Sequence, residues 1–498
     1  MKAALLAAAA IVVQPVPPRP TPPGTGAPAG DPDAACVRLK DTDFSLLRDA
    51  PTLLVSAAPQ AATAEQPALC LVNGRIAPTI GFRMWLPLAT WNGKFAQGGC
   101  GGRCGDILDD GCRIVVARGY ACIAADMGHK GTFYDDLWAI DNVPGDIDFG
   151  FRSTHVATLA GKAVTTAFYG VAPRYSYYFG ASTGGRQGLV AAQRFPEDFD
   201  GIVAGEPAMG TPGTVRPETG PALRDSVAAL TAEGRALLSP AEVLMIHAAA
   251  VRACDMDDNA RDGFISDPRG CGFKPVQLLC NGAKTPDCLT AAQVAGVTRV
   301  YANGAMPGSE KGWIGAYVGE DGGPGRYGRR LANPYKYPYA WIFHDATNPD
   351  LRAFKARGGK LILYQGWADE ATYPGNPAIY YDTVERLMGG RAATQDFFRL
   401  FMIPGQSHIP QVGGGAETVD YLSYLEAWVE RGQAPDVLRA EKLKTLARFA
   451  GPVTYAAYLT PDNVAFSRPV YPYPVRARYL GRGDVKDAAN WRPVTPRR

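Results

Sequence analysis

The sequence predicts an α/β fold with a mostly parallel sheet that helices cover on both faces. Short apolar runs end in turns that carry glycine or aspartate, and Ala- and Leu-rich helical stretches lie between them, as at 153–169 and 188–195. This alternation is typical of such sheets. The pattern fades near residue 208 and resumes near 349, and a chain of 498 residues is long enough for a second domain. We therefore expect a domain inserted between two strands.

Six apolar runs are the candidate strands of this sheet. They are the two runs in "RIVVARGYACIAADMGH" (113–129), "YSYYFGAS" (175–182), "FDGIVAGEP" (199–207), "KLILYQGWAD" (360–369) and "FFRLFMIPGQSH" (397–408). Functional groups in such sheets gather in the loops after the carboxyl ends of the strands. The residues that follow these runs are therefore the first candidates for a site.

The predicted organisation has four parts. Residues 1–34 read as a signal peptide and a Pro-rich linker, because Lys2 precedes an apolar stretch and a Pro/Gly/Ala segment follows. Residues 35–207 and 349–498 would form the core in two pieces, and 208–348 the inserted domain, where helical patterns and four cysteines replace the strand signals.

Composition excludes several classes of protein. The net charge is +3 without a basic stripe, which argues against a nucleic-acid partner, and no apolar run is long enough to span a membrane. Ten cysteines, an even number, favour a secreted or periplasmic protein with disulfide bonds. A zinc cluster is the alternative for four of them, although no CxxC pair supports it: Cys100, Cys104, Cys112 and Cys122.

Ser182 is the candidate nucleophile. It lies in Gly180-Ala-Ser-Thr-Gly184, between an apolar run and a helix-like segment, which matches the sharp strand-to-helix turn that exposes a catalytic serine. The alternative is an ordinary glycine turn with an exposed serine. Only the partners of the serine separate the two interpretations.

The partners are expected in the order serine, acid, histidine. Of five histidines, His408 follows the strand run 397–403 in a short turn, where a general base could reach the serine. Asp369 directly follows the run 360–366 and is the candidate acid, with Glu370 as its neighbouring competitor. His247 lies on a helical pattern among apolar residues and is expected to be a packed core residue.

An acyl-transfer site also needs two backbone donors for the oxyanion. The residue after the nucleophile supplies one, which assigns the Thr183 N–H. The glycine-rich stretch 91–106 is the expected source of the second, with Gly99 or Gly101 as the choice. The alternative is an ordinary glycine loop held by disulfides.

A second constellation is the acidic stretch "CDMDDNARDGFISDPRGC" (254–271). Clustered carboxylates repel one another unless a cation neutralises them, and an all-oxygen set suits calcium. It is not an EF-hand, because Ala260 stands at the position of the glycine and Ser266 at that of the bidentate glutamate. A solvated acidic loop is the alternative. We expect a structural calcium ion.

Together these motifs resemble the tannase and feruloyl esterase family. The resemblance runs from Cys36 onward through "WNGKF…GGCGG", "AADMGHKG", "DIDFGFRSTH", "FGASTGGRQG", "FPEDFDGIVAGEPA", the acidic stretch and "GGKLILYQGWAD". It implies an α/β-hydrolase core with a lid domain, esters of aromatic acids as substrates, and a triad of Ser182, Asp369 and His408. It implies no organic cofactor.

The resemblance also implies calcium ligands and disulfides. The ligands would be the side chains of Asp255, Asp258 and Asp262 with the carbonyls of Ala260 and Phe264. The implied disulfides are Cys36–Cys70, Cys254–Cys271 and Cys280–Cys288, and it leaves the pairing of the other four cysteines open. The sequence departs from the family where cysteines usually flank the serine and the histidine, because Ala181 and Ile409 stand there.

The expected function is that of a secreted serine esterase acting on small aromatic esters, phenolic or terephthalate-like. A serine peptidase and a non-catalytic binding protein are the alternatives. Candidate substrate contacts in the lid are Trp313 and Arg326, with Tyr317 and Tyr327 beside them. The sequence leaves the oligomeric state open.

Overall fold

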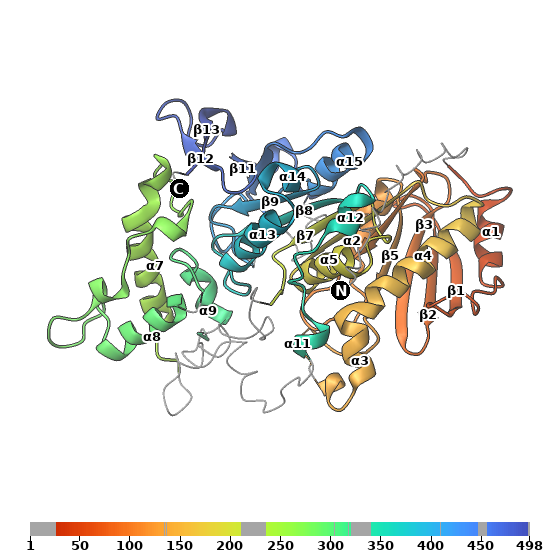
Figure 1. Ribbon diagram of the computed structural model, residues 1–498, viewed down its shortest axis with the longest axis horizontal. Helices are drawn as coiled ribbons and strands as arrows, with labels where there is room; N and C mark the ends of the chain where they lie inside the picture. The colour runs from red at the N-terminus through yellow and green to blue at the C-terminus, as the bar shows by residue number, and fades with distance from the viewer. Residues whose placement is uncertain are drawn as a thin grey trace, which may run out of the picture.

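The computed structural model describes residues 26–496 except 134, 136, 211–235, 303, 317, 320–339, 409 and 447–455. A nine-stranded sheet forms the centre of the molecule (Figure 1). Its strand order is β1-β2-β3-β5-β4-β6-β7-β8-β9. The strands are β1 Thr52–Gln60, β2 Leu69–Ile76, β3 Ile80–Pro87, β4 Lys94–Gly98, β5 Ala121–Ala125, β6 Tyr175–Ala181, β7 Gly201–Gly205, β8 Lys360–Gly366 and β9 Phe398–Ile403.

The sheet has a parallel part and an antiparallel part. From β5 to β9 all neighbouring strands are parallel, whereas β1, β2, β3 and β5 pair antiparallel. The mostly parallel α/β sheet is thus confirmed, and the antiparallel strands at one edge are an addition that the sequence did not predict. Parallel strands end at one edge, so the turns after β4, β6, β7, β8 and β9 lie together there.

Helices cover both faces of the sheet. Apolar side chains of α4, α5 and α13 pack in the core on one face, and those of α2 and α15 in the core on the other. The helices along the chain are α1 Pro32–Leu39, α2 Asp110–Ala117, α3 Val143–Ile147, α4 Ser153–Tyr169, α5 Thr183–Arg194, α7 Pro240–Cys254, α8 Ala291–Ala302, α9 Trp313–Ala316, α11 Ala340–Phe343, α12 Arg352–Ala356, α13 Gly375–Leu387, α14 Arg391–Gln395 and α15 Tyr421–Arg431.

One predicted strand run is a helix. Residues 113–117 belong to α2, which buries Cys112, Val115 and Val116 on one face. The spacing of three and four residues between them is that of a helix, and the apolar run concealed it. The other five runs contain β5 to β9.

The amino-terminal prediction needs a second correction. Helix α1 begins at Pro32, inside the segment predicted as linker, because the Asp31 side chain caps it and proline suits the first turn. Gly26 also pairs with Trp91. The predicted signal peptide lies outside the described residues.

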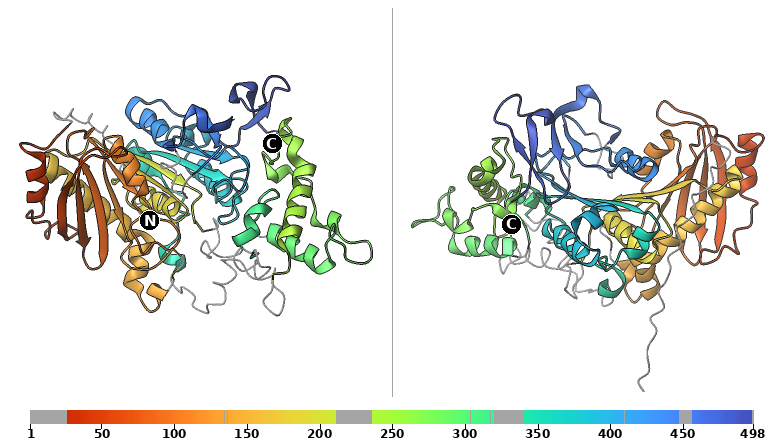
Figure 2. Two further views of the ribbon diagram at one scale, coloured as in Figure 1. Left: turned by 180° about the vertical axis from the view of Figure 1, so that it is seen from behind. Right: turned by 45° about the horizontal axis from the view of Figure 1, so that its top comes forward.

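Between β7 and β8 the chain forms a separate group of helices. Figures 1 and 2 show α7, α8 and α9 at the opposite end of the molecule from β1 and β2. This group has its own hydrophobic core, which includes Val243, Ile246 and Val297. After α15, two small two-stranded sheets follow, formed by β10 Leu438–Leu443 with β11 Val464–Val470 and by β12 Arg476–Tyr479 with β13 Trp491–Val494.

All ten cysteines are paired in five disulfides. The three pairs implied by the family resemblance are present, and the remaining bonds are Cys100–Cys104 and Cys112–Cys122. Zinc is bound by thiolates, and a disulfide offers none. The alternative of a four-cysteine zinc cluster is therefore wrong.

Candidate active site

Ser182 occupies a strained turn between β6 and α5. Its backbone has φ 59° and ψ −120°, which few residues other than glycine adopt. Gly180 and Gly184 make the turn possible, because a Cβ on Gly180 would lie 2.8 Å from the backbone of Gly184. The Ser182 N–H donates to the Gly205 carbonyl at 2.9 Å, which fixes the turn against the end of β7. This is the strand–turn–helix context expected of a serine nucleophile.

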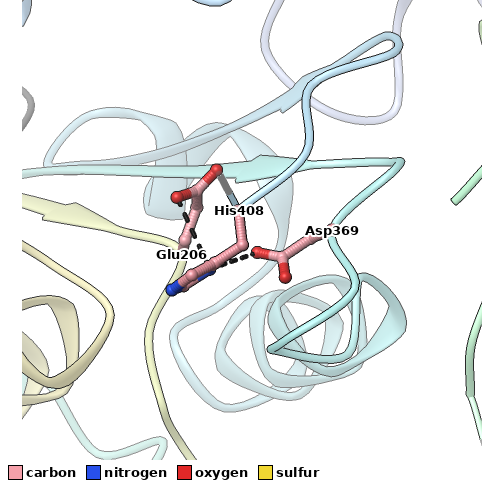
Figure 3. A group of neighbouring side chains, drawn as sticks. All are labelled: Glu206, Asp369 and His408. Atoms are coloured by element: carbon pink, nitrogen blue, oxygen red, sulfur yellow. Dashed lines mark hydrogen bonds and ion pairs between the residues drawn. The ribbon is translucent and has the colours of Figure 1, made fainter. Parts of the chain in front are cut away.

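His408 and Asp369 meet at the same edge of the sheet. His408 follows β9, Asp369 follows β8, and the His408 Nδ1 lies 2.9 Å from the Asp369 Oδ2 (Figure 3). The Asp369 carboxylate also accepts hydrogen bonds from the side chains of Gln365 and Thr372 and from the backbone N–H groups of Ala371 and Thr372. These donors hold the carboxylate in one orientation, so it can fix the ring of His408.

Ser182 and His408 open into one cavity of about 190 Å³. Its wall also contains Ala181, residues 98–101 (three glycines and Cys100) and acidic side chains described below. The apolar and aromatic side chains of the wall are Leu108, Phe133, Phe179, Tyr364 and Tyr421. The structure thus brings the candidate nucleophile and base together around a space suited to an apolar group.

The two oxyanion candidates in the early loop differ in their hydrogen bonds. The Gly99 N–H donates to the Phe179 carbonyl at 2.9 Å, because the pairing of β4 with β6 continues through it, and it is therefore unsuited to the role. The Gly101 N–H donates to no other described residue, and Gly101 lines the cavity. Thr183 opens α5, so its N–H has no acceptor within the helix. The choice of Gly99 is therefore wrong, and the assignment of Thr183 and Gly101 stays a prediction.

A second buried carboxylate faces His408. Glu206, directly after β7, has its Oε2 3.7 Å from the His408 Nδ1. Burial raises the pKa of Glu206 well above its usual value, the charge of His408 opposes the rise, and Asp369 adds to it. The sequence prediction missed Glu206, although it ends the run "FDGIVAGEP" and the strand-end argument applied to it. The nitrogen of His408 and the oxygens of Asp369 and Glu206 lie close enough together to hold a metal ion.

Glu370 is held differently from Asp369. Its Oε2 accepts the backbone N–H of His408 at 3.1 Å. Burial and the neighbouring Asp369 raise the pKa of Glu370 to about 7, against the influence of His408. For His408, burial disfavours the charged ring, but Asp369, Glu206 and Glu370 outweigh burial and raise its pKa above the usual value.

The other four histidines lie outside this cavity. His129 stacks on Trp138, and His344 packs edge-on against Phe149. Three of the four are paired with carboxylates: His155 with Asp198 at 2.8 Å, His247 with Glu310 at 3.0 Å and His344 with Asp146 at 3.7 Å. His247 is buried in the helical region, as the sequence predicts.

Three acidic side chains of the loop 255–264 are buried, those of Asp255, Asp258 and Asp262, and the loop contacts the C-terminal strand β11. Arg468 of β11 donates to the Asp262 Oδ2 at 2.8 Å, and both side chains are only 6 % exposed. Asp255 accepts the backbone N–H groups of Asp262 and Gly263, and the Asp258 Oδ1 accepts that of Ala260. A solvated loop would not bury its carboxylates in this way.

Several oxygens of this loop lack partners, which suits a cation. The Asp262 Oδ1 is buried without a hydrogen bond, and no described residue donates to the carbonyls of Ala260 or Phe264. Burial raises the pKa of Asp262 to about 6, although Arg468 opposes the rise. Burial likewise raises the pKa of Asp258. Three carboxylates and two carbonyls of this loop supply the kind of oxygen ligand that calcium prefers, and calcium binding at this loop stays a prediction.

The structure tests only one of the predicted substrate contacts. Trp313 is buried in the core of the helical region and does not line the cavity. Arg326, Tyr317 and Tyr327 lie outside the described residues, as does Ile409.

Comparison with known proteins places the chain in a family. The profile "Tannase and feruloyl esterase" matches residues 63–322 and 337–494. The chain belongs to this family and is a carboxylic ester hydrolase. This excludes the alternative of a non-catalytic binding protein.

Relatives match over nearly their whole length. Mono(2-hydroxyethyl) terephthalate hydrolase of Piscinibacter sakaiensis is 31% identical, over 93% of this chain and 92% of that protein. An uncharacterized esterase of Xanthomonas campestris pv. campestris is also 31% identical, over 92% and 90%. The crystal structure of feruloyl esterase B from Aspergillus oryzae has a TM-score of 0.77 at 26% identity, over 93% of this chain and 100% of that one.

Proposed function

We propose that this protein is a secreted or periplasmic serine esterase that hydrolyses esters of aromatic acids, phenolic or terephthalate-like, through an acyl-enzyme. The observation that carries the proposal is the arrangement at the sheet edge. Ser182 stands on a strained turn, and its cavity also holds His408, whose far nitrogen is bound to Asp369.

In the proposed mechanism, the Ser182 hydroxyl attacks the ester carbonyl and passes its proton to the Nε2 of His408. Asp369 fixes the ring and stabilises its protonated form. The N–H groups of Thr183 and Gly101 bind the oxyanion. His408 then protonates the departing alcohol and activates the water that releases the acid.

An aromatic substrate is supported by the shape and lining of the cavity. Apolar cavities of about 150 Å³ bind benzene, and this cavity of about 190 Å³ has aromatic walls. Two relatives are named for such esters, a mono(2-hydroxyethyl) terephthalate hydrolase and a feruloyl esterase.

Residues 208–348 act as a lid in this proposal, and a calcium ion stabilises the acidic loop. Asp255, Asp258 and Asp262 would hold the ion together with the carbonyls of Ala260 and Phe264. Its contribution is neutralisation of three buried carboxylates, which would otherwise repel one another. Because the Phe264 ring packs against Gly405 in the turn before His408, order in this loop also supports the base.

Export is supported by the five disulfides, which persist in oxidising compartments. No helix among the described residues combines the length and apolar character needed to cross a bilayer.

The test is a substrate panel on the wild-type protein. We expect hydrolysis of methyl esters of hydroxycinnamic and benzoic acids and of terephthalate monoesters, and covalent labelling of Ser182 by a fluorophosphonate. The amides of the same acids measure peptidase character and should react far more slowly. Hydrolysis without labelling at Ser182 would exclude the proposed nucleophile.

A further inference from the structure

Asp369 is not the only carboxylate directed at the far nitrogen of His408. The Glu206 Oε2 is 3.7 Å from the same Nδ1 that binds Asp369 at 2.9 Å, so the ring lies between two acids (Figure 3). Glu206 follows β7 and Asp369 follows β8, and these are adjacent parallel strands. We propose that Glu206 is a positioning residue, a second acid that shares with Asp369 the orientation and charge stabilisation of His408. This inference rests on the proposed serine mechanism.

The backbone holds Glu206 in place. Its N–H donates to the Tyr364 carbonyl at 2.8 Å, continuing the pairing of β7 with β8, and its φ is +42°. A residue other than glycine rarely adopts such a φ, and strain of this kind is concentrated at functional sites. The preceding Gly205 has no room for a side chain, because a Cβ there would lie 2.1 Å from the ring of Tyr364. The end of β7 therefore directs the side chain of Glu206 into the interior of the protein.

The groups around the Glu206 carboxylate favour an interaction with His408. It is only 5 % exposed, and His408 is the one basic side chain paired with it among the described residues. Its Oε1 accepts from the Gln406 Nε2 at 2.6 Å. A buried carboxylate is costly unless a cation or hydrogen bonds compensate for it. The imidazolium that forms when His408 takes the serine proton is such a cation.

Glu206 also fastens the turn that carries the base. Gln406 precedes His408 by two residues, and its carbonyl accepts the N–H of Ala368 at 2.9 Å. A Cβ on Gly366 would lie 2.2 Å from that carbonyl oxygen, so the turn rests directly on the end of β8. The bond from Gln406 to Glu206 ties the same turn to β7. The histidine turn is thus held from both neighbouring strands.

Several titratable groups face this cluster. Asp369 and Glu370 come from the end of β8, and Tyr421 from the start of α15. Glu417, paired with Lys442 of β10, lines the cavity beside them. Any change of charge at Glu206 adds to the effect of these neighbouring acids, which the single variants at Glu206 leave intact.

The test compares variants in the hydrolysis of 4-nitrophenyl acetate across pH. In Glu206→Gln the side chain keeps its size and can still bond to Gln406, but it carries no charge. The ionised carboxylate of Glu206 stabilises the protonated ring and glutamine does not, so the substitution lowers the pKa of the ring. We expect the acidic limb of kcat/KM to move to lower pH by at least half a unit, and Glu206→Asp to restore the wild-type limb.

The variant Asp369→Asn then distinguishes the contribution of Glu206 from that of Asp369. Where a triad has one acid, this change lowers kcat by about 10⁴-fold. Because Glu206 can still orient His408 in this variant, we expect kcat to fall by only about 10²-fold. In the double variant with Glu206→Gln, kcat should fall by a further tenfold or more. A limb that does not move in Glu206→Gln, or a double variant no slower than Asp369→Asn, would overturn the inference.

A matched control lies at the other end of the same strand. Asp198 precedes β7, is buried, and binds the Nδ1 of His155 at 2.8 Å. Asp198→Asn removes a similar buried carboxylate next to a histidine and should leave the pH profile unchanged. If Glu206→Gln does not fold, an NMR pH titration of the His408 ring in the wild type and in Glu206→Asp decides the question: a pKa at or below the usual histidine value overturns the inference. Equal activity of wild type and Ser182→Ala would instead disprove the serine mechanism itself.

Discussion

The catalytic edge of the sheet and the acidic loop 255–264 both bury carboxylates, but they satisfy them differently. At the edge, Asp369 accepts four hydrogen bonds besides the one from His408, all from groups that follow β8 or lie in it. In the loop, Asp262 has one ion pair, with Arg468, and one oxygen without a partner. Protein groups thus satisfy both oxygens of Asp369, whereas one oxygen of Asp262 is left without a partner.

From this contrast we expect the sheet edge to position groups for chemistry and the acidic loop to maintain structure. Changes at the catalytic edge should lower activity while the fold persists. Changes in the acidic loop should lower stability first, and activity only through the turn that carries His408.

The largest expected effect is the loss of activity in Ser182→Ala. Removing the nucleophile of a serine hydrolase lowers kcat by about 10⁴-fold or more, while the melting temperature should remain close to that of the wild type. Ser56→Ala is the control, since Ser56 bonds to Asn73 between β1 and β2, away from the cavity. If kcat fell by less than tenfold, Ser182 would not be the nucleophile.

The next largest effect is expected on stability, in Arg468→Met. Removing one partner of a buried ion pair costs about 3–5 kcal/mol, and Arg468 and Asp262 are such a pair. The matched control is Arg439→Met in β10, whose partner Glu441 forms an exposed pair worth about 0–1 kcal/mol. Chemical unfolding measures both changes. Equal losses would mean that the buried pair does not anchor the loop.

Calcium should stabilise the protein by a smaller amount. A ligand that binds only the folded state at one hundred times its Kd contributes about 2.7 kcal/mol. Chelation should lower the melting temperature and added calcium should restore it. Asp262→Asn should weaken this response, whereas Asp257→Asn, at an exposed position outside the ligand set, should keep it. An unchanged melting temperature on chelation would argue against the ion.

The smallest effect is a displaced pH profile in the wild type. The neighbouring acids raise the pKa of His408, although burial opposes them. The base must be neutral to act, so activity should rise with pH and be lost as pH falls through this raised pKa. We expect the acidic limb of kcat/KM at least half a unit above the usual histidine value of about 6.5. A limb below 6.5 would show that burial outweighs the carboxylates.

The sequence alone determined the α/β class, five strands of the parallel part, and helices such as 153–169. These elements depend on apolar spacing and local turn residues, which the sequence displays directly. It also led to Ser182, Asp369 and His408 as candidates, because parallel strands bring their carboxyl ends to one edge whatever their separation along the chain.

Only the tertiary structure decided what depends on neighbours distant in sequence. It showed that 113–117 is a helix, that the Gly99 N–H is already bonded, and that Trp313 lies away from the cavity. It also placed Glu206 beside His408 and Arg468 beside Asp262. The sequence marks which residues end strands, but the pairing of strands and the packing of loops fix which of those residues meet and which hydrogen-bonding groups remain free.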